Sequence, residues 1–113
     1  MATELDELIE RLRRAAEERG WTSFHTPKNL AMALAGEVGE LLAEFQWLTP
    51  EESFQVMGSP RKAEAVRSEL ADVFSYLLEL ADVLGVDLVE AANAKADVVA
   101  RRYAEGYYEP PAL

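Results

Sequence analysis

The chain has 113 residues and half of them are hydrophobic, so its length fits one domain, residues 1–113, with a buried core. It contains no cysteine and carries a formal charge of −10, which excludes disulfides and disfavours binding to a nucleic-acid polymer. No apolar run approaches about 20 residues, so we expect a soluble, cytoplasmic protein that does not enter a membrane.

Signals for helix starts and ends follow one another along the chain. Thr26, Thr49 and Ser59 each precede a proline, the pattern of an N-cap followed by proline at the first helical position. Thr49 also begins a capping box, and glycines at 20, 58, 85 and 106 stand where helices would end. We predict helices over residues 4–19, 27–47, 60–84 and 87–104, with a short helical turn near 50–56. The predicted class is therefore all-α, as a four-helix antiparallel bundle.

The predicted helix over residues 27–47 is apolar or small nearly all round. One stripe consists of Leu30, Leu34, Val38, Leu41 and Phe45, and a second consists of Met32, Gly36, Gly39 and Ala43. Two apolar faces in so small a domain predict that a second chain covers one of them, as a homodimer or a dimer of dimers. The alternative is that the small residues only let neighbouring helices of the same chain approach closely.

Two pairs of acidic residues occupy equivalent positions beside the apolar stripes of their helices. At about 100° per residue, Glu40 lies near 300° from Glu37, and Asp72 lies near 300° from Glu69. If the two stripes pack together, the four carboxylates face one groove, where their repulsion is costly without a cation. Oxygen ligands without thiol or imidazole suit Mg²⁺, and Mn²⁺ is possible. These four residues are therefore candidate metal ligands.

Acidic residues three apart also occur at Glu4/Glu7, Glu79/Asp82 and Asp87/Glu90, as chance would place them in an acidic helical protein. The spacing alone is thus weak evidence. A solvated acidic face beside the core stands as the alternative to a metal site.

Aromatic and basic side chains supply what a nucleotide would need. Trp21, His25 and Trp47 flank the acidic helix in sequence, and aromatic faces can sandwich a nucleobase, although they can equally pack where helices meet. Lys95 is one of few basic residues and is a candidate contact to phosphate oxygens, unless it only lies along the surface.

Two segments, "GWTSFHTPKNLAMALAGEVGELLAEFQW" and "SELADVFSYLLELADVLGVDL", closely resemble the all-α nucleoside triphosphate pyrophosphohydrolases, the MazG-like group that includes dCTP pyrophosphatase. The group's motif is E-x-x-E on one helix and E-x-x-D on the next. Here it corresponds to Glu37/Glu40 and Glu69/Asp72, with 28 residues between Glu40 and Glu69.

The resemblance implies an enzyme of nucleotide-pool housekeeping that cleaves a nucleoside triphosphate, dCTP-like or modified, to the monophosphate and pyrophosphate. It implies that Mg²⁺ is held by Glu37, Glu40, Glu69 and Asp72, and that Glu37 or Glu40 orients or deprotonates the attacking water. It also implies a nucleobase pocket with Trp21, His25 and Trp47, orienting contacts from Asn29 and Tyr76, a phosphate contact from Lys95, and a homodimer or homotetramer.

The chain departs from the family pattern in the last helix, where Val99 stands in place of an asparagine and Ala104 in place of a proline. The resemblance implies a polar contact to substrate from that asparagine, and the side chain of Val99 cannot supply it. The competing function is consequently a non-catalytic module that binds nucleotides or a partner helix through the same groove.

Overall fold

The computed structural model describes residues 2–108, and the regular elements in this range are all helical. The α-helices are α1 (Glu4–Glu18), α2 (Pro27–Ala43), α3 (Pro50–Ser53), α4 (Pro60–Leu84) and α5 (Leu88–Ala104). Two short 3₁₀ turns, η1 (Thr22–Phe24) and η2 (Val56–Gly58), complete the order. The predicted all-α class is confirmed for the described residues.

The helix starts follow the capping residues of the sequence. The side chains of Thr26, Thr49 and Asp87 each accept a hydrogen bond from the backbone N–H three residues further on. Thr49 forms the predicted capping box. Ser59 precedes α4 but makes no such side-chain bond. Gly85 ends α4 with φ of 70°, a left-handed conformation that glycine adopts at little cost.

The helix predicted over residues 27–47 ends earlier, at Ala43. Glu44 is its C-cap, and the chain then runs through turns to Thr49, the N-cap of α3. Because Thr49 precedes a proline, it is extended rather than helical, which requires α2 to stop before it. Trp47 therefore lies in a turn rather than on the helix.

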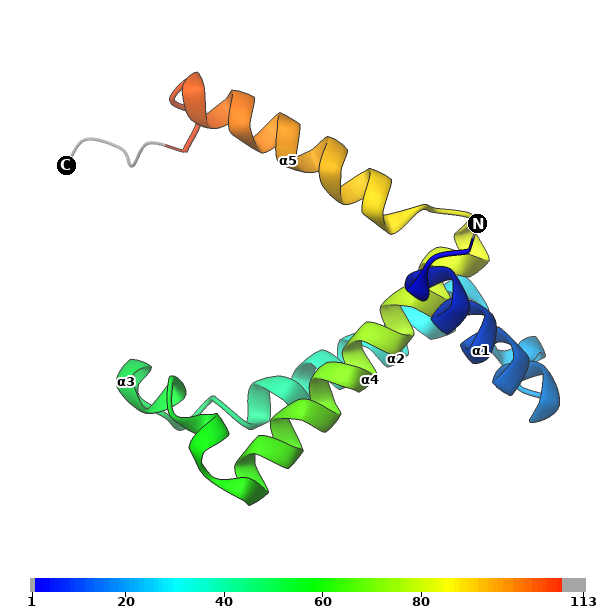
Figure 1. Cartoon of the computed structure of the whole chain (residues 1–113), viewed down its shortest axis with the longest axis horizontal. Helices are drawn as coiled ribbons and strands as arrows, with labels where there is room; N and C mark the ends of the chain where they lie inside the picture. Colours follow the sequence, from blue (N-terminus) through cyan, green and yellow to red (C-terminus); the bar gives the residue numbers. More distant parts are fainter. Residues whose placement is uncertain (1, 109–113) are drawn as a thin grey trace.

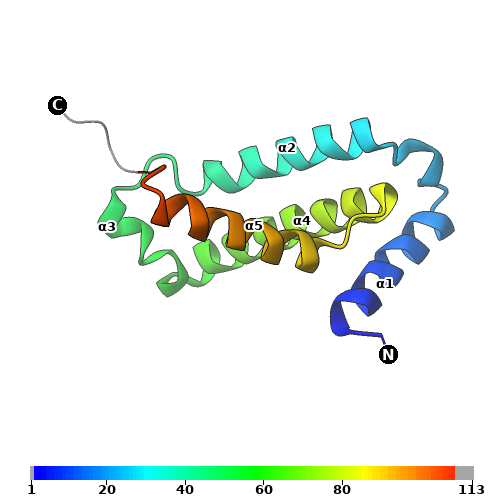
Figure 2. The same cartoon turned by 90° about the horizontal axis from the view of Figure 1, so that it is seen from above.

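The centre of the molecule is the pair α2 and α4, which run side by side in opposite directions (Figures 1 and 2). Leu30 of α2 and Leu78 of α4 are the most deeply buried large side chains, each 1% exposed. Helix α1 packs against the end of α4, where the Arg13 guanidinium donates to both carboxylate oxygens of Asp82, at 3.0 and 2.6 Å. The η2 turn packs against α4 toward its beginning.

The chain is open rather than closed into the predicted four-helix bundle. Within residues 2–108, α5 makes no extensive contact with the other helices, and Figure 1 shows it pointing away from the α2–α4 pair. The Cα radius of gyration is 17.8 Å, against about 13 Å for a compact domain of this length. The physical reason is that Gly85 and the Asp87 cap separate α5 from α4 and turn it outward. The bundle is thus not formed by one chain alone.

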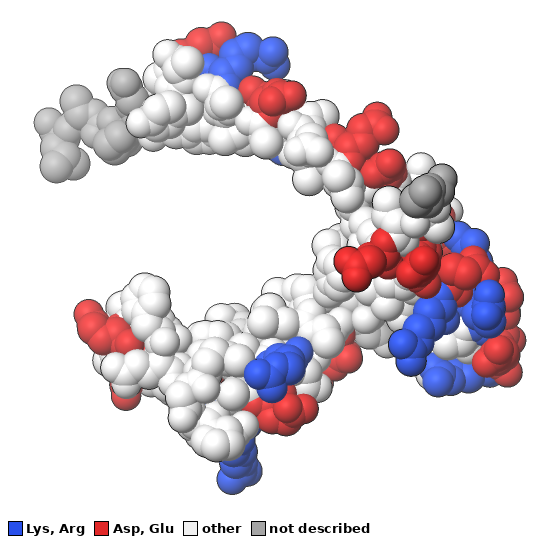
Figure 3. All heavy atoms as spheres, viewed as in Figure 1, with Lys and Arg blue, Asp and Glu red and all other residues white. Residues whose placement is uncertain are grey.

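Large apolar side chains remain exposed on every long helix after α1. They are Met32, Val38 and Leu42 on α2, Leu70, Phe74, Leu77, Val83 and Leu84 on α4, and Val89, Val99 and Tyr103 on α5. In Figure 3 the concave side between α5 and the α2–α4 pair is largely uncharged. None of the described helices combines the length and apolarity that crossing a bilayer requires.

Candidate active site

The antiparallel pairing of α2 and α4 brings together three of the four predicted metal ligands. Glu37, Glu40 and Glu69 each offer one carboxylate oxygen, and these three oxygens all lie within 4.8 Å of one another. Glu37 and Glu69 are half-buried and Glu40 is exposed. We call these three residues the carboxylate cluster.

Asp72, the fourth predicted ligand, is exposed and lies beside the carboxylate cluster rather than within it. Its charge nevertheless contributes to raising the pKa of both Glu37 and Glu69. Asp72 is one helical turn from Glu69 on α4, so it shares that face of the helix.

No ion pair found within residues 2–108 neutralises the charge of the carboxylate cluster. Burial raises the pKa of Glu37, and the neighbouring charges of Glu40, Asp72 and Glu69 raise it further. Burial likewise raises the pKa of Glu69, with Glu40 and Asp72 adding to the shift. One carboxylate oxygen of Glu37 and one of Glu69 are buried and have no hydrogen-bond partner among the described residues. Burying such oxygens costs folding free energy unless a cation or a hydrogen-bond donor reaches them.

The donor set fits a hard divalent cation. All the converging atoms are carboxylate oxygens, and Mg²⁺ is bound in proteins by a few carboxylates while water and phosphate oxygens fill its other positions. Mn²⁺ accepts the same oxygen ligands. Glu37 and Glu69, with their buried and unpartnered oxygens, are therefore residues that would hold such an ion.

We expect the metal-free protein to lose stability as the pH rises above 4.5, the ordinary glutamate pKa. Raised folded-state pKa values for Glu37 and Glu69 mean that the folded state binds more protons than the unfolded state, so deprotonation favours unfolding. The melting temperature, measured with EDTA between pH 5 and pH 8, should fall more steeply for the wild type than for Glu37→Gln. Equal slopes for the two proteins would contradict the repulsion within the carboxylate cluster.

The aromatic residues predicted to contact a base lie at opposite ends of α2. Trp21 and His25 precede α2, with their ring centroids 6.3 Å apart, whereas Trp47 follows its C-terminal end and is 87% exposed. A helix of this length is about 25 Å long, so one chain does not place Trp21 and Trp47 on the same base. The side-chain amide of Asn29 donates to the backbone carbonyl of Phe24, which fixes the turn that carries His25.

Tyr76 and Lys95 have different positions relative to the carboxylate cluster. Tyr76 lies one helical turn after Asp72 on α4 and shares that face of the helix, and burial together with the charges of Glu79, Glu37 and Asp72 raises its pKa. Lys95 is exposed on α5, the helix that leaves the rest of the chain. The structure therefore brings Tyr76 to the cluster and does not bring Lys95 there within one chain.

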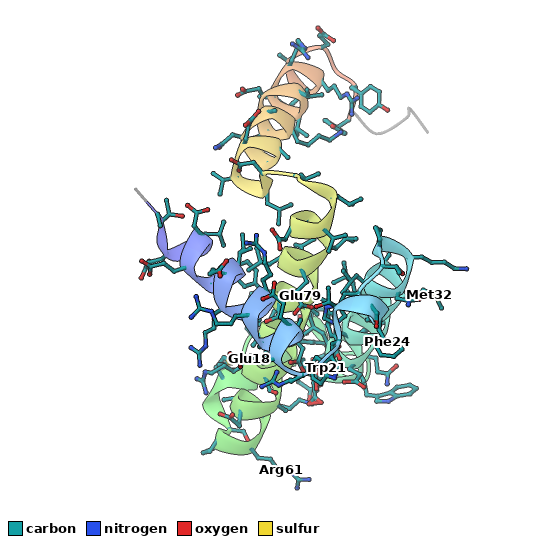
Figure 4. The ribbon with its side chains drawn as sticks, turned by 90° about the vertical axis from the view of Figure 1, so that its right-hand side faces the viewer. Glu18, Trp21, Phe24, Met32, Arg61 and Glu79 are labelled. Atoms are coloured by element: carbon teal, nitrogen blue, oxygen red, sulfur yellow. The ribbon has the colours of Figure 1, made fainter. Side chains whose placement is uncertain are left out.

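A small cavity of about 90 Å³ adjoins the turn between α1 and α2, and sequence reasoning missed it. Its wall includes Glu79 and Asp82, an acidic pair whose three-residue spacing is by itself weak evidence for a site. In Figure 4, Glu79 lies near the end of α1 and the turn that carries Trp21. The available sequence signal was the continuation of the 69, 72, 76 face of α4 by one further turn to Glu79.

Comparisons with known proteins agree on one relationship. Residues 33–106 match the profile of the MazG-like family. Over 88 residues, 78% of this chain, the sequence is 48% identical to dCTP pyrophosphatase 1 of Bos taurus and 49% identical to that of Homo sapiens. The chain spans about half the length of these curated relatives, 52% in each case. A crystal structure of a pyrophosphatase from Archaeoglobus fulgidus DSM 4304 is similar with a TM-score of 0.84 and 40% identity, covering 91% of this chain and 94% of that one.

Proposed function

Because the chain belongs to the MazG-like family, we propose that it is a nucleoside triphosphate pyrophosphohydrolase, which releases the nucleoside monophosphate and pyrophosphate. The observation that carries the proposal is the carboxylate cluster between α2 and α4, with its two buried, unpartnered oxygens. The names of the relatives, two dCTP pyrophosphatases and a pyrophosphatase, support the same reaction.

The residues have distinct roles in this proposal. Glu37, Glu40, Glu69 and Asp72 would hold Mg²⁺, or Mn²⁺ in its place; the first three form the carboxylate cluster and Asp72 lies beside it. The ion, when bound, supplies neutralisation of phosphate charge and lowers the pKa of water in the site. Glu37 or Glu40 orients or deprotonates the water that attacks the phosphoanhydride.

The base is held on the side of the site where Trp21 and His25 lie, next to the start of α2. Asn29 keeps that turn in place through its bond to the Phe24 carbonyl, and Tyr76, one helical turn after Asp72 on α4, would help to orient the substrate. A dCTP-like or modified deoxynucleotide is the proposed substrate, in keeping with the relatives' names. The proposal includes a housekeeping role in the nucleotide pool, a cytoplasmic location and a single domain over residues 1–113.

The working form is proposed to be a homodimer or a dimer of dimers. Leu42 is 60% exposed, Leu70 51% and Phe74 45%, and an apolar surface of this extent is typical of one that another chain covers. The outward α5 offers Val99 and Tyr103 for the same purpose. Lys95, together with Trp47, would then reach the carboxylate cluster of a second copy and complete its substrate contacts.

The test is a panel of canonical and base-modified NTPs and dNTPs with Mg²⁺, resolving monophosphate plus pyrophosphate from diphosphate plus phosphate. We expect the first pair of products, and only with a divalent metal. Nucleotide binding without any turnover by the folded protein would instead favour the non-catalytic module, for which Val99 on α5 would be the first residue to replace.

A further inference from the structure

The cavity beside the turn between α1 and α2 is mostly apolar but contains ionisable groups. Leu12 and Ala16 of α1 and Leu78 of α4 form much of its wall, and Thr22 and His25 contribute from the turn. Arg13, Glu79 and Asp82 also line the cavity. Its size, about 90 Å³, suits a single-ring base better than a purine.

Only one of the two α4 carboxylates in this cavity is already engaged. Asp82 accepts two hydrogen bonds from Arg13, at 2.6 and 3.0 Å, and this ion pair holds α1 against α4. Glu79 is half-buried, and its side chain takes part in none of the side-chain hydrogen bonds or ion pairs found within residues 2–108. Burial raises the pKa of Glu79, while the nearby His25 lowers it. Glu79 thus presents an unused acceptor within an apolar cavity.

The cavity lies within the reach of a nucleotide bound at the carboxylate cluster. Tyr76 lies on α4 one helical turn after Asp72 and one turn before Glu79, so the same face of the helix leads from the carboxylate cluster to the cavity. Asp72 and Glu79 are seven residues apart on α4, a separation of about 10 Å along the axis. A nucleotide spans a similar distance from its α-phosphate to the Watson–Crick edge of its base.

We propose that Glu79 selects the nucleobase, by accepting a hydrogen bond from an exocyclic amino group such as that of cytosine. The inference rests on the proposed function, because it requires a nucleotide whose phosphates occupy the carboxylate cluster. Uracil and thymine carry a carbonyl oxygen at the position of that amino group. Two acceptors would then face each other in a partly desolvated cavity, which is unfavourable. Glu79 is accordingly a specificity residue, and the Arg13–Asp82 ion pair is a positioning contact that fixes the opposite wall.

The experiment compares kcat/KM for dCTP and dUTP in the wild type, in Glu79→Gln, and in Glu18→Gln as the matched control. Glu18 is an exposed carboxylate near the end of α1, outside the cavity, so Glu18→Gln removes the same charge without touching it. Glutamine has the shape of glutamate but offers both a donor and an acceptor, so it can bond either base. We expect Glu79→Gln to reduce the dCTP preference at least about tenfold, with helical content unchanged, and Glu18→Gln to retain it.

Calorimetric binding of dCMP and dUMP separates this inference from the proposed function. A wild-type preference for dCMP that Glu79→Gln abolishes supports the role of Glu79, even if no triphosphate is hydrolysed. Turnover with an unchanged dCTP preference in Glu79→Gln overturns the role of Glu79 and leaves the hydrolase proposal intact. Equal binding of dCMP and dUMP by the wild type also overturns it.

Discussion

Replacing Glu40 by glutamine is expected to lower kcat/KM at least about a thousandfold for every nucleotide that the protein hydrolyses. One oxygen of Glu40 lies within 4.8 Å of oxygens from Glu37 and Glu69, so the substitution removes charge from the proposed metal site while preserving side-chain shape. Steady-state kinetics with Mg²⁺ measure the loss. Circular dichroism should remain that of the wild type, because Glu40 is exposed and supports no packing.

The matched control for this substitution is Glu64→Gln on α4. Glu64 is exposed, and its ion pair with Arg67, one helical turn further along α4 at 3.3 Å, is of a kind that contributes little to stability. The Glu64→Gln variant should therefore keep near wild-type kinetics. Near-normal turnover by Glu40→Gln would show that the carboxylate cluster does not hold the catalytic metal, and the acidic face would then be a solvated one.

Replacing Phe74 by glutamate is expected to convert the assembled protein into monomers and to lower its activity more than about tenfold. Phe74 is 45% exposed in the single chain, and a carboxylate placed in an apolar contact with a second copy would be desolvated without a partner. In the proposed assembly activity would fall as well, because Lys95 and Trp47 would no longer reach the carboxylate cluster of a second copy. Light scattering coupled to size-exclusion chromatography measures the mass.

Phe74→Leu is the control, since it keeps an apolar side chain at the same place and should stay assembled and active. A wild-type protein that elutes as a monomer at micromolar concentration would contradict the proposed assembly. So would an unchanged oligomeric mass in Phe74→Glu.

The sequence predicted the helices and the grouping of Glu37, Glu40 and Glu69 because both depend on local patterns. Thr49 and Asp87 cap helices through bonds to residues three positions away, which a reader of the sequence can locate. Glu37 and Glu69 came together because each lies beside an apolar stripe, and those stripes determine which faces of α2 and α4 meet. The helical periodicity of the apolar residues was therefore sufficient to predict that the residues of the carboxylate cluster lie together.

Contacts between distant parts of the chain were not predictable in this way. The Arg13–Asp82 ion pair joins residues 69 positions apart, and nothing in the spacing of either residue indicates the other. The cavity that contains Glu79 exists only because α1 crosses α4 at that point. The outward course of α5 likewise depends on the turn between α4 and α5, although both helices were predicted correctly.

That turn depends on Gly85. A Cβ added there would meet no neighbouring atom within 4 Å, so there is space for a side chain. A substitution would be unfavourable because the backbone has a φ of 70°, which residues other than glycine rarely adopt. Residues that prefer right-handed torsions would favour continuing α4 toward α5 as a single rod, about 67 Å long if it ran from residue 60 to residue 104. Such a rod would carry Lys95 in a different direction altogether. One torsion angle, far in sequence from the carboxylate cluster, thus steers where the last helix of each copy can deliver its side chains.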